Sequence, residues 1–450
     1  MERNLTIGSP VKLILSFAIP LYIGNLFQQS YNIADIFIVG RIIGLDALAA
    51  VGCTGSINFL ILGFINGFGI GASVITSQRY GALDMDGVRR SFAATIIISA
   101  GLAVSFTAVS VLCARPLLVF LSTPPEIIDN AFNYIIIIFY GIPTAMLFNL
   151  FANVMRAVGD SRTPLYILAF SCVLNIVLDL VFILILKTGL SGVACATLIA
   201  QLTSGLFCIP VIFKKLPMLK LRKTDWKFNR GEISKHLKLA LPVGFQMSII
   251  AIGSITVTFA LNQLGTTAVA AFTAAGRIDV LAYLILFSFG GAMTTYSAQN
   301  YGAKKPDRIK KGVFQISVIA CAYCIIIFLV FIFTGDFFPA LFLGRESAQS
   351  LFMASRYLII CSSFYIFLAM LFIIRQSLLG MGDSVTPTIA GVMELAMRIF
   401  AAIFLGGMFG FEGICYANPL AWIGALIPLI IAYFIRIKKI SGNVLDKAGF

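Results

Sequence analysis

The chain has 450 residues, of which 59% are hydrophobic and 12% are charged. Because a soluble domain is about one quarter charged, this composition excludes a soluble globular protein and predicts a membrane protein. The formal net charge is +14. The Lys and Arg residues collect in alternate loops, which indicates membrane topology and argues against nucleic-acid binding.

The sequence contains about twelve hydrophobic segments that reach the length of a membrane helix, about 20 residues. The first six are predicted at 11–39, 47–77, 91–113, 128–155, 164–186 and 190–213. The second six are predicted at 237–263, 268–298, 312–334, 350–379, 387–409 and 411–436. The predicted fold class is an all-α polytopic membrane protein with twelve transmembrane helices.

One long polar segment, residues 214–236, divides the chain into two halves. We predict an N-terminal six-helix lobe (1–213), a basic cytoplasmic linker (214–236), a C-terminal six-helix lobe (237–436) and a cytoplasmic tail (437–450). The basic residues favour the side that holds both termini, so the positive-inside rule predicts cytoplasmic termini. The only histidine, His236, lies in the basic linker, where we expect it to be solvated.

The two halves repeat one another in sequence. The QxYGA motif at 78–82 matches 299–303, and the GDSxTP motif at 159–164 matches 382–387. Six helices per half give equivalent helices the same orientation, so the repeat is parallel. Carriers built in this way bind substrate between their halves and open alternately to each side.

Some of these motifs have a structural interpretation. The GDSxTP repeats are predicted to be turns in which proline occupies the first helical turn and Asp or Ser caps it. The glycine-rich segment at 63–71 superficially resembles a phosphate loop, but it lacks the required strand and lysine. We interpret these glycines as sites of close helix packing.

Polar side chains follow one face of the first predicted helix. Gln28, Tyr31, Asn32 and Asp35 are three, four and seven residues apart, which places them on one side. A carboxylate is expensive in lipid, so this face should line a bundle interior or a water-filled cavity. Pro20 offers a kink in the same helix. The pattern predicts an ion-coupled carrier, and a structural polar cluster is the alternative.

The fifth and sixth predicted helices add further oxygen ligands. Asn175 and Asp179 are four residues apart on one face, and Thr197 follows in the next helix. With Asp35 they supply two carboxylates, an amide and a hydroxyl from three helices. Two carboxylates in a low-dielectric pocket cannot both stay ionised cheaply, so a proton or Na⁺ should neutralise one. Sequence alone does not bring the three helices together.

The C-terminal half offers fewer embedded charges. Glu394 and Arg398 are spaced to pair in the eleventh helix, as an internal ion pair or as part of a transport site. Arg277 and Arg398 are the only bases we place within the membrane, and Arg277 with Asp279 is interpreted as a cavity-mouth feature. No Ser/His/Asp set, HExxH motif or Walker loop occurs, so we expect no enzyme activity and no cofactor besides a coupling ion.

The whole chain resembles the multidrug and toxic compound extrusion (MATE) family. The resemblance is carried by the doubled six-helix layout, the segment ADIFIVGRIIG, the loop QRYGA and the junction RAVGDSRTP. It implies a V-shaped pair of pseudo-symmetric helical bundles. It also implies export of cationic or amphipathic drugs in exchange for Na⁺ or H⁺.

The resemblance also implies roles for individual residues. The family's N-lobe cation site, which would bind H⁺ or Na⁺, carries over to Asp35, Asn175, Asp179 and Thr197. The substrate cavity is assigned to Gln28, Tyr31, Asn32 and Asn153, and the hinge of the first helix to Pro20. The C-lobe acids of the NorM-like branch are absent, with Leu368 at one expected position. Coupling should therefore rest on the N-lobe, with Glu394 and Arg398 as a candidate C-lobe substitute.

The expected location is a bacterial plasma membrane, with a small cationic or amphipathic substrate and the lipid bilayer as partners. Two lobes in one chain make a monomer sufficient. The alternative function is a flippase for a lipid-linked oligosaccharide or cell-wall precursor. Such a flippase should need a strongly cationic cavity, which two embedded arginines do not provide. A channel or receptor explains the repeat and the buried acids less well.

Overall fold

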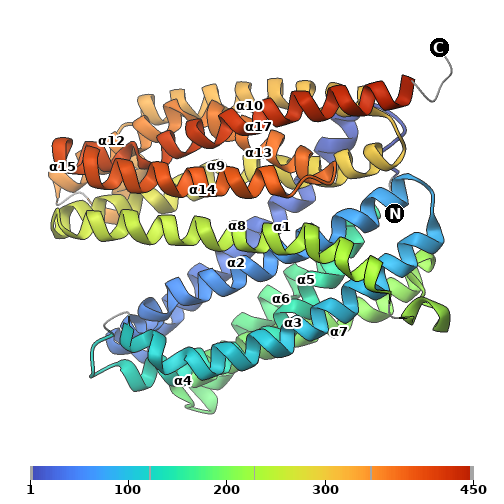
Figure 1. Ribbon diagram of the computed structural model, residues 1–450. Helices are drawn as coiled ribbons and strands as arrows, with labels where there is room; N and C mark the ends of the chain where they lie inside the picture. Colours follow the sequence, from blue (N-terminus) through green and yellow to red (C-terminus); the bar gives the residue numbers. More distant parts are fainter. Residues whose placement is uncertain (1–3, 121–122, 228, 345–346, 446–450) are drawn as a thin grey trace. The chain divides into compact units, whose positions relative to one another are not determined.

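The computed structural model describes residues 4–120, 123–227, 229–344 and 347–445. Within these ranges the protein consists of helices and connecting turns, without a β-strand (Figure 1). Residues 446–450, the end of the predicted tail, lie outside the described residues.

The helices of the first half follow one another with short connections. They are α1 (Pro10–Ile38), α2 (Leu45–Gly81), α3 (Met85–Phe120), α4 (Ile128–Tyr140), α5 (Ile142–Ala157), α6 (Arg162–Leu180) and α7 (Gly189–Lys215). Short π-helical segments extend α1 over Val39–Ile43 and α6 over Val181–Ile185. Two 3₁₀ turns, Pro217–Leu219 and Lys223–Trp226, occupy the connection that follows α7.

The second half begins with α8, which starts seven residues earlier than predicted. Its helices are α8 (Arg230–Asn262), α9 (Thr266–Gly302), α10 (Pro306–Thr334), α11 (Phe337–Leu343), α12 (Ala348–Ser363), α13 (Tyr365–Gly380), α14 (Val385–Phe400), α15 (Gly406–Phe409), α16 (Phe411–Cys415) and α17 (Ala417–Leu445). A π-helical segment, Ala401–Leu405, extends α14.

Among the described residues, 10 helices are long and apolar enough to cross a membrane. Two bent pairs raise the number to 12 if each pair is one span: α4 with α5, bent by 43°, and α12 with α13, bent by 50°. The sequence predicted both pairs as single helices. The first break lies at Gly141, two residues before Pro143, which cannot continue the helical hydrogen bonds of the preceding turn. Nothing in the sequence around Phe364 explains the second break.

The chain divides into two compact units, and two helices run from one unit into the other. Unit 1 contains Ile23–Gly244, and unit 2 contains Leu5–Tyr22 and the chain from Phe245 onward. Helix α1 therefore begins in unit 2 and ends in unit 1, whereas α8 does the reverse. Leu5 is fully buried in the core of unit 2 and Ala240 in that of unit 1. This division differs from the predicted lobes, which separated at 214–236.

Close packing inside unit 1 depends on the glycines of α2. A Cβ atom on Gly71 would lie 2.7 Å from Cα of Ala240, and one on Gly69 would lie 2.7 Å from the Asn153 amide. At Gly71 the close atom belongs to the backbone of α8, so only glycine allows this approach, which confirms the packing interpretation for that residue.

The two GDSxTP repeats form the predicted turns. The Asp160 carboxylate accepts hydrogen bonds from the backbone N–H groups of Arg162 (3.1 Å) and Thr163 (3.0 Å). In the second repeat, Asp383 accepts from the N–H of Thr386 at 3.0 Å. Each aspartate thereby satisfies backbone donors that a helix start leaves unpaired.

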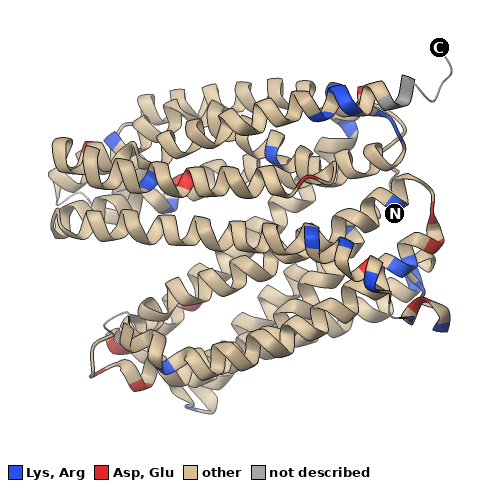
Figure 2. Ribbon diagram, in the orientation of Figure 1, with Lys and Arg blue, Asp and Glu red and all other residues tan. Residues whose placement is uncertain are grey.

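Charged residues lie mainly near helix ends and connections, with few along the middle of the helices (Figure 2). The exceptions define the candidate site of each unit, because a charge in the middle of a membrane helix is costly to bury.

Candidate functional site

Three helices of unit 1 carry the predicted cation-site residues. Asp35 lies on α1 and is half-buried, Asn175 and Asp179 lie on α6 and are 1% and 0% exposed, and Thr197 lies buried on α7. Asn175 and Asp179 point the same way because four residues make about one helical turn.

The Thr197 hydroxyl joins the three helices. Its oxygen accepts hydrogen bonds from the Tyr31 hydroxyl at 3.1 Å and from the Asn175 amide at 3.5 Å. The same hydroxyl donates to the carbonyl of Val193 at 3.1 Å. The sequence left open whether these helices meet, and in the structure they do.

Asp35 and Asp179 bring several oxygen atoms together, and four acceptor oxygens of the cluster lack a hydrogen-bond donor among the described residues. The carboxyl groups of Asp35 and Asp179 lie within hydrogen-bonding reach of one another. As carboxylates both are acceptors, and neither can donate to the other. Both oxygens of Asp179, Oδ1 of Asp35 and Oδ1 of Asn175 are buried without a hydrogen bond from any described residue. A buried polar group without a partner costs about 1–3 kcal/mol, and more when it is charged.

This arrangement is chemically suited to a proton or a hard cation. A shared proton would turn the carboxylate pair into a donor and an acceptor, and Na⁺ would be bound by the same oxygens. The described residues contain no group of three or more His, Cys, Asp or Glu side chains that could hold a metal ion. The ligands that the cluster offers to a cation are two carboxylates, an amide oxygen and a hydroxyl.

Tyr134 belongs to the same cluster and was missed from the sequence. It lies on α4, is 9% exposed, and is close enough to Asp35, Asp179 and Tyr31 for electrostatic interaction. The only feature of the sequence that could have identified Tyr134 is its hydroxyl, at the start of the otherwise apolar run YIIII. Nothing in helix periodicity relates that hydroxyl to α1 or α6.

The residues assigned to a substrate cavity differ in their burial. Gln28 and Asn32 are exposed on α1, whereas Tyr31 is half-buried beside Thr197. Asn153 is buried on α5, where its amide donates to the Asn149 carbonyl at 2.9 Å and its oxygen accepts from Arg156 at 3.4 Å. Gly69 of α2 lies against the same amide. The assignment of these residues to a substrate cavity stays a prediction.

Pro20 lies inside α1 and is buried in unit 2. It precedes by two residues the point, between Tyr22 and Ile23, where the helix passes from unit 2 into unit 1. The missing N–H of a proline weakens the helix at this place, so its assignment as a hinge stays a prediction with a structural basis.

The charged pair predicted in the C-terminal half is part of a larger cluster in unit 2. The Glu394 carboxylate accepts from Arg375 and lies 3.7 Å from Arg398, and all three side chains are buried. Counting Arg277 and Arg398 as the only embedded bases was wrong, since Arg375 on α13, within a candidate membrane span, is only 3% exposed. Arg375 lies near the end of an apolar segment, where hydropathy alone does not separate a buried base from one at the surface.

Asp279 is also buried, contrary to its interpretation as a cavity-mouth residue. It is 4% exposed, and its two oxygens accept hydrogen bonds from the hydroxyls of Tyr365 and Tyr357. The Asn418 amide in turn donates to Tyr357 at 3.2 Å. These donors come from α12, α13 and α17 and could not be assigned from sequence spacing.

The prediction of a solvated His236 was wrong. The side chain is fully buried in unit 1, with Nε2 2.8 Å from the Ser91 hydroxyl and Nδ1 2.8 Å from the Glu232 carbonyl. One helical turn earlier, Glu232 forms a bidentate pair with Arg79, at 2.7 Å for each oxygen. The polar first turns of α8 are thus bound to unit 1 through Glu232 and His236. Their polar composition alone led to the assignment of this segment as a linker.

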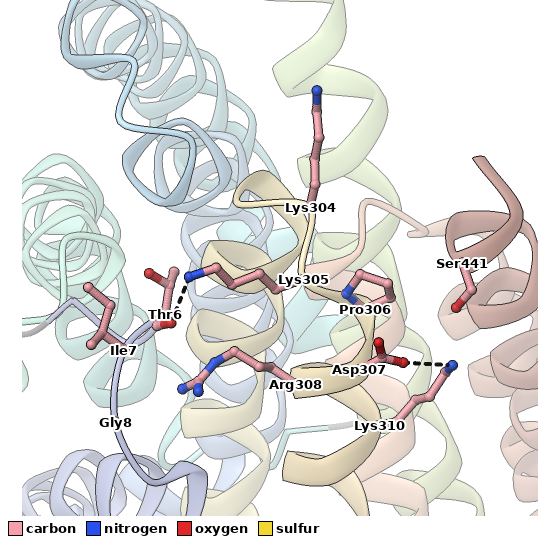
Figure 3. A pocket seen from close by; sticks show the side chains of 10 residues that line it. All are labelled: Thr6, Ile7, Gly8, Lys304, Lys305, Pro306, Asp307, Arg308, Lys310 and Ser441. Atoms are coloured by element: carbon pink, nitrogen blue, oxygen red, sulfur yellow. Dashed lines mark hydrogen bonds and ion pairs between the residues drawn. The ribbon is translucent and has the colours of Figure 1, made fainter. Parts of the chain in front are cut away.

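A pocket of about 660 Å³ lies where the chain leading into α1 meets the turn between α9 and α10 (Figure 3). Its lining is basic, but Lys305 donates to the Thr6 carbonyl at 3.1 Å and Arg308 to the Leu5 carbonyl at 3.3 Å. Lys310 pairs with Asp307 at 3.1 Å. Lys305 and Arg308 thus bind the segment that leads into α1, so we interpret the pocket as structural.

Repeated helical halves and buried charges inside the helix bundles define an integral membrane protein of the transporter class. The MatE family matches residues 20–181 and 242–404, more than half of the sequence. The chain therefore belongs to the MATE family, as the resemblance predicted.

Named relatives and solved structures agree with this family. The chain is 32% identical over 309 residues to the probable multidrug resistance protein YpnP of Bacillus subtilis strain 168, with 68% of each chain covered. It is 23% identical over 435 residues to the multidrug export protein MepA of Staphylococcus aureus strain MSSA476, with 95% of each covered.

An outward-facing structure of a multidrug resistance MATE family transporter gives a TM-score of 0.89 at 23% identity, over 97% of this chain and 98% of that one. A MATE structure in a bent conformation also gives 0.89 at 23% identity, over 99% and 98%. At this identity the likeness establishes the fold, and it confirms the predicted all-α fold class.

Proposed function

We propose that this protein is a secondary active multidrug exporter. It would move organic cations or amphipathic drugs out of the cell in antiport with H⁺ or Na⁺ by alternating access. The observation that carries the proposal is the group of four buried acceptor oxygens on Asp35, Asn175 and Asp179 that no described residue satisfies. Such a group is costly when empty and favourable when a proton or cation binds.

The same cluster suits the release of the ion as well as its binding. Its ligands come from α1, α6 and α7, and the Thr197 hydroxyl links all three. A shift of α1 relative to α6 would separate Asp35 from Asp179 and remove the favourable geometry. Pro20 provides a weak point in the hydrogen bonding of α1 for such a shift.

The substrate class rests on the relatives, two of which are named for multidrug resistance or multidrug export. For this chain we infer a small cationic or amphipathic substrate. The exposed polar side chains of Gln28 and Asn32 would line its path beside Tyr31. We also propose a bacterial plasma membrane location with both termini cytoplasmic, and a monomer as the working unit.

The experiment uses purified protein in proteoliposomes loaded with a fluorescent organic cation. A pH gradient and a Na⁺ gradient are imposed separately. Wild type is compared with Asp35→Asn and with Asp46→Asn, a matched control at an exposed position in the first turn of α2. The proposal expects efflux under one gradient, lost in Asp35→Asn and kept in Asp46→Asn. A folded wild type that responds to neither gradient would contradict it and favour the flippase alternative.

A further inference from the structure

The buried ion cluster of unit 2 carries an excess of positive charge. Arg375 on α13 and Arg398 on α14 share one carboxylate, that of Glu394. The three side chains are 3%, 7% and 3% exposed, respectively. Asp279, another buried acid of unit 2, already accepts hydrogen bonds from Tyr357 and Tyr365. Two guanidinium groups against one carboxylate leave one positive charge unmatched in direct contact, and buried charge is costly without a partner.

Gln246 lies on the face of α8 that packs against α14, the helix that carries Glu394 and Arg398. We call this contact between α8 and α14, together with the ion cluster beside it, the seam. A Cβ atom on Gly391 would lie 2.9 Å from Cγ of Gln246, so the two positions face each other one turn before Glu394. One turn further along α8, the Ile250 carbonyl accepts a hydrogen bond from Arg398 at 3.3 Å. Gly253 lies against Arg398, where a Cβ atom would be 3.1 Å from the guanidinium. The glycines thus leave room for long polar side chains between α8 and α14.

The seam contains donors without acceptors. Nε2 of Gln246, Nε of Arg375 and Nε of Arg398 are all buried, and no described residue accepts a hydrogen bond from them. Gln246 is only 2% exposed, so its amide does not form hydrogen bonds with bulk water. This is the reverse of the cluster around Asp35 and Asp179, where buried acceptors lack donors from the described part of the chain.

We propose that Gln246, Arg375 and Arg398 form a binding site for a monovalent anionic group, either a carboxylate or a halide ion. Such a group would neutralise the excess charge and accept from N–H donors that have no other partner. Guanidinium groups bind carboxylates with short, charge-assisted hydrogen bonds, and the Gln246 amide adds a neutral donor. The anion could be the carboxylate of a transported amphipathic molecule or a free chloride ion.

A direct test of the site measures anion binding and does not depend on transport. Purified protein is heated in chloride, in acetate and in isethionate, a bulkier sulfonate. The variants are Gln246→Glu, which builds a negative charge into the site, and Gln263→Glu, the same change at an exposed turn. Wild type and Gln263→Glu should be more thermostable in chloride or acetate than in isethionate, and Gln246→Glu should lose this difference. An equal difference in Gln246→Glu would overturn the proposal.

A second test identifies the source of the anion and rests on the proposed export function. Efflux is compared for a xanthene dye with a free carboxylate and for its methyl ester, in chloride and in isethionate. If the carboxylate belongs to the substrate, Gln246→Glu lowers the acid-to-ester ratio by about tenfold or more, the effect of one lost charge-assisted hydrogen bond. If the anion is free chloride, the ratio stays constant and the dependence of efflux on chloride disappears.

If the wild type exports the dyes, and Gln246→Glu changes neither the acid-to-ester ratio nor the effect of chloride on efflux, the anion site is overturned. A wild type that moves neither dye, but still shows the Gln246-dependent thermal difference, supports the site and contradicts the export function. The two failures are therefore distinguishable.

Discussion

Asp35 on α1 and Asp179 on α6 bring their carboxyl groups within hydrogen-bonding reach of one another. Neither oxygen of Asp179 receives a hydrogen bond from any described residue. Two adjacent acceptors in a buried place repel one another unless a proton or cation lies between them. The packing of α1 and α6 thus creates the place where we propose that a proton or cation binds.

Asp179→Asn should separate transport from stability. The new amide can donate to Asp35, so the repulsion disappears and the free energy of unfolding should stay the same or rise by about 1 kcal/mol. Ion-coupled efflux should fall about tenfold or more, because the coupling between ion and substrate is lost. Thermal unfolding and dye efflux measure the two effects. A variant that is strongly destabilised, or one with normal efflux, would count against the account.

Thr197→Val should destabilise unit 1. The change removes the acceptor of the Tyr31 hydroxyl and the Asn175 amide, and leaving buried donors unsatisfied costs about 1–3 kcal/mol. Thr203→Val is the control on the same helix, because the Thr203 hydroxyl is exposed and bonds only within α7. Thermal unfolding of both variants in detergent is the measurement. Equal melting temperatures would mean that the Thr197 hydroxyl does not join the helices as the structure has it.

Two glycines of α2 should respond to alanine with opposite signs. Gly71→Ala places a Cβ atom 2.7 Å from Cα of Ala240 and should cost about 1–3 kcal/mol through overpacking. Gly52→Ala meets nothing within 4 Å and should stabilise the helix by about 0.5–1 kcal/mol. Denaturation of the two variants checks this difference. Gly71→Ala with wild-type stability would show that α2 and α8 do not approach so closely.

The ion cluster of unit 2 should behave as a coupled network. Arg375→Met removes the closer contact of Glu394 and should destabilise unit 2, but by less than the loss of an isolated buried pair, because Arg398 still neutralises the carboxylate. Glu394→Gln should also destabilise, and the double variant should cost clearly less than the sum of the two. The measurement is a double-mutant cycle of unfolding free energies. Additive effects would show that the two side chains do not interact.

The hydrophobic segments and the internal repeat predicted the fold, because a membrane helix needs a fixed length of apolar sequence. The break at Phe364 and the placement of Leu5–Tyr22 in unit 2 could not be predicted, because no residue pattern in either segment indicates them.

The candidate site divides in the same way between what sequence could and could not predict. Helix periodicity placed Asn175 and Asp179 on one face, and the structure brings them to Tyr31 and Thr197. Periodicity along one helix holds no information on the distance between helices, so Tyr134 and Arg375 were missed. His236 was misjudged for a related reason, because its basic neighbours indicated solvent while packing against α3 buries it. The cation-binding role of the site stays a prediction.

The most direct measurement imposes a gradient of the organic cation across proteoliposomes, without an ion gradient, and follows the movement of H⁺ and Na⁺. Antiport requires that the substrate drive the ion as the ion drives the substrate. The account predicts counterflow of one of the two ions in wild type and none in Asp35→Asn. Dye movement without ion movement in wild type, or unchanged ion flux in Asp35→Asn, would contradict it.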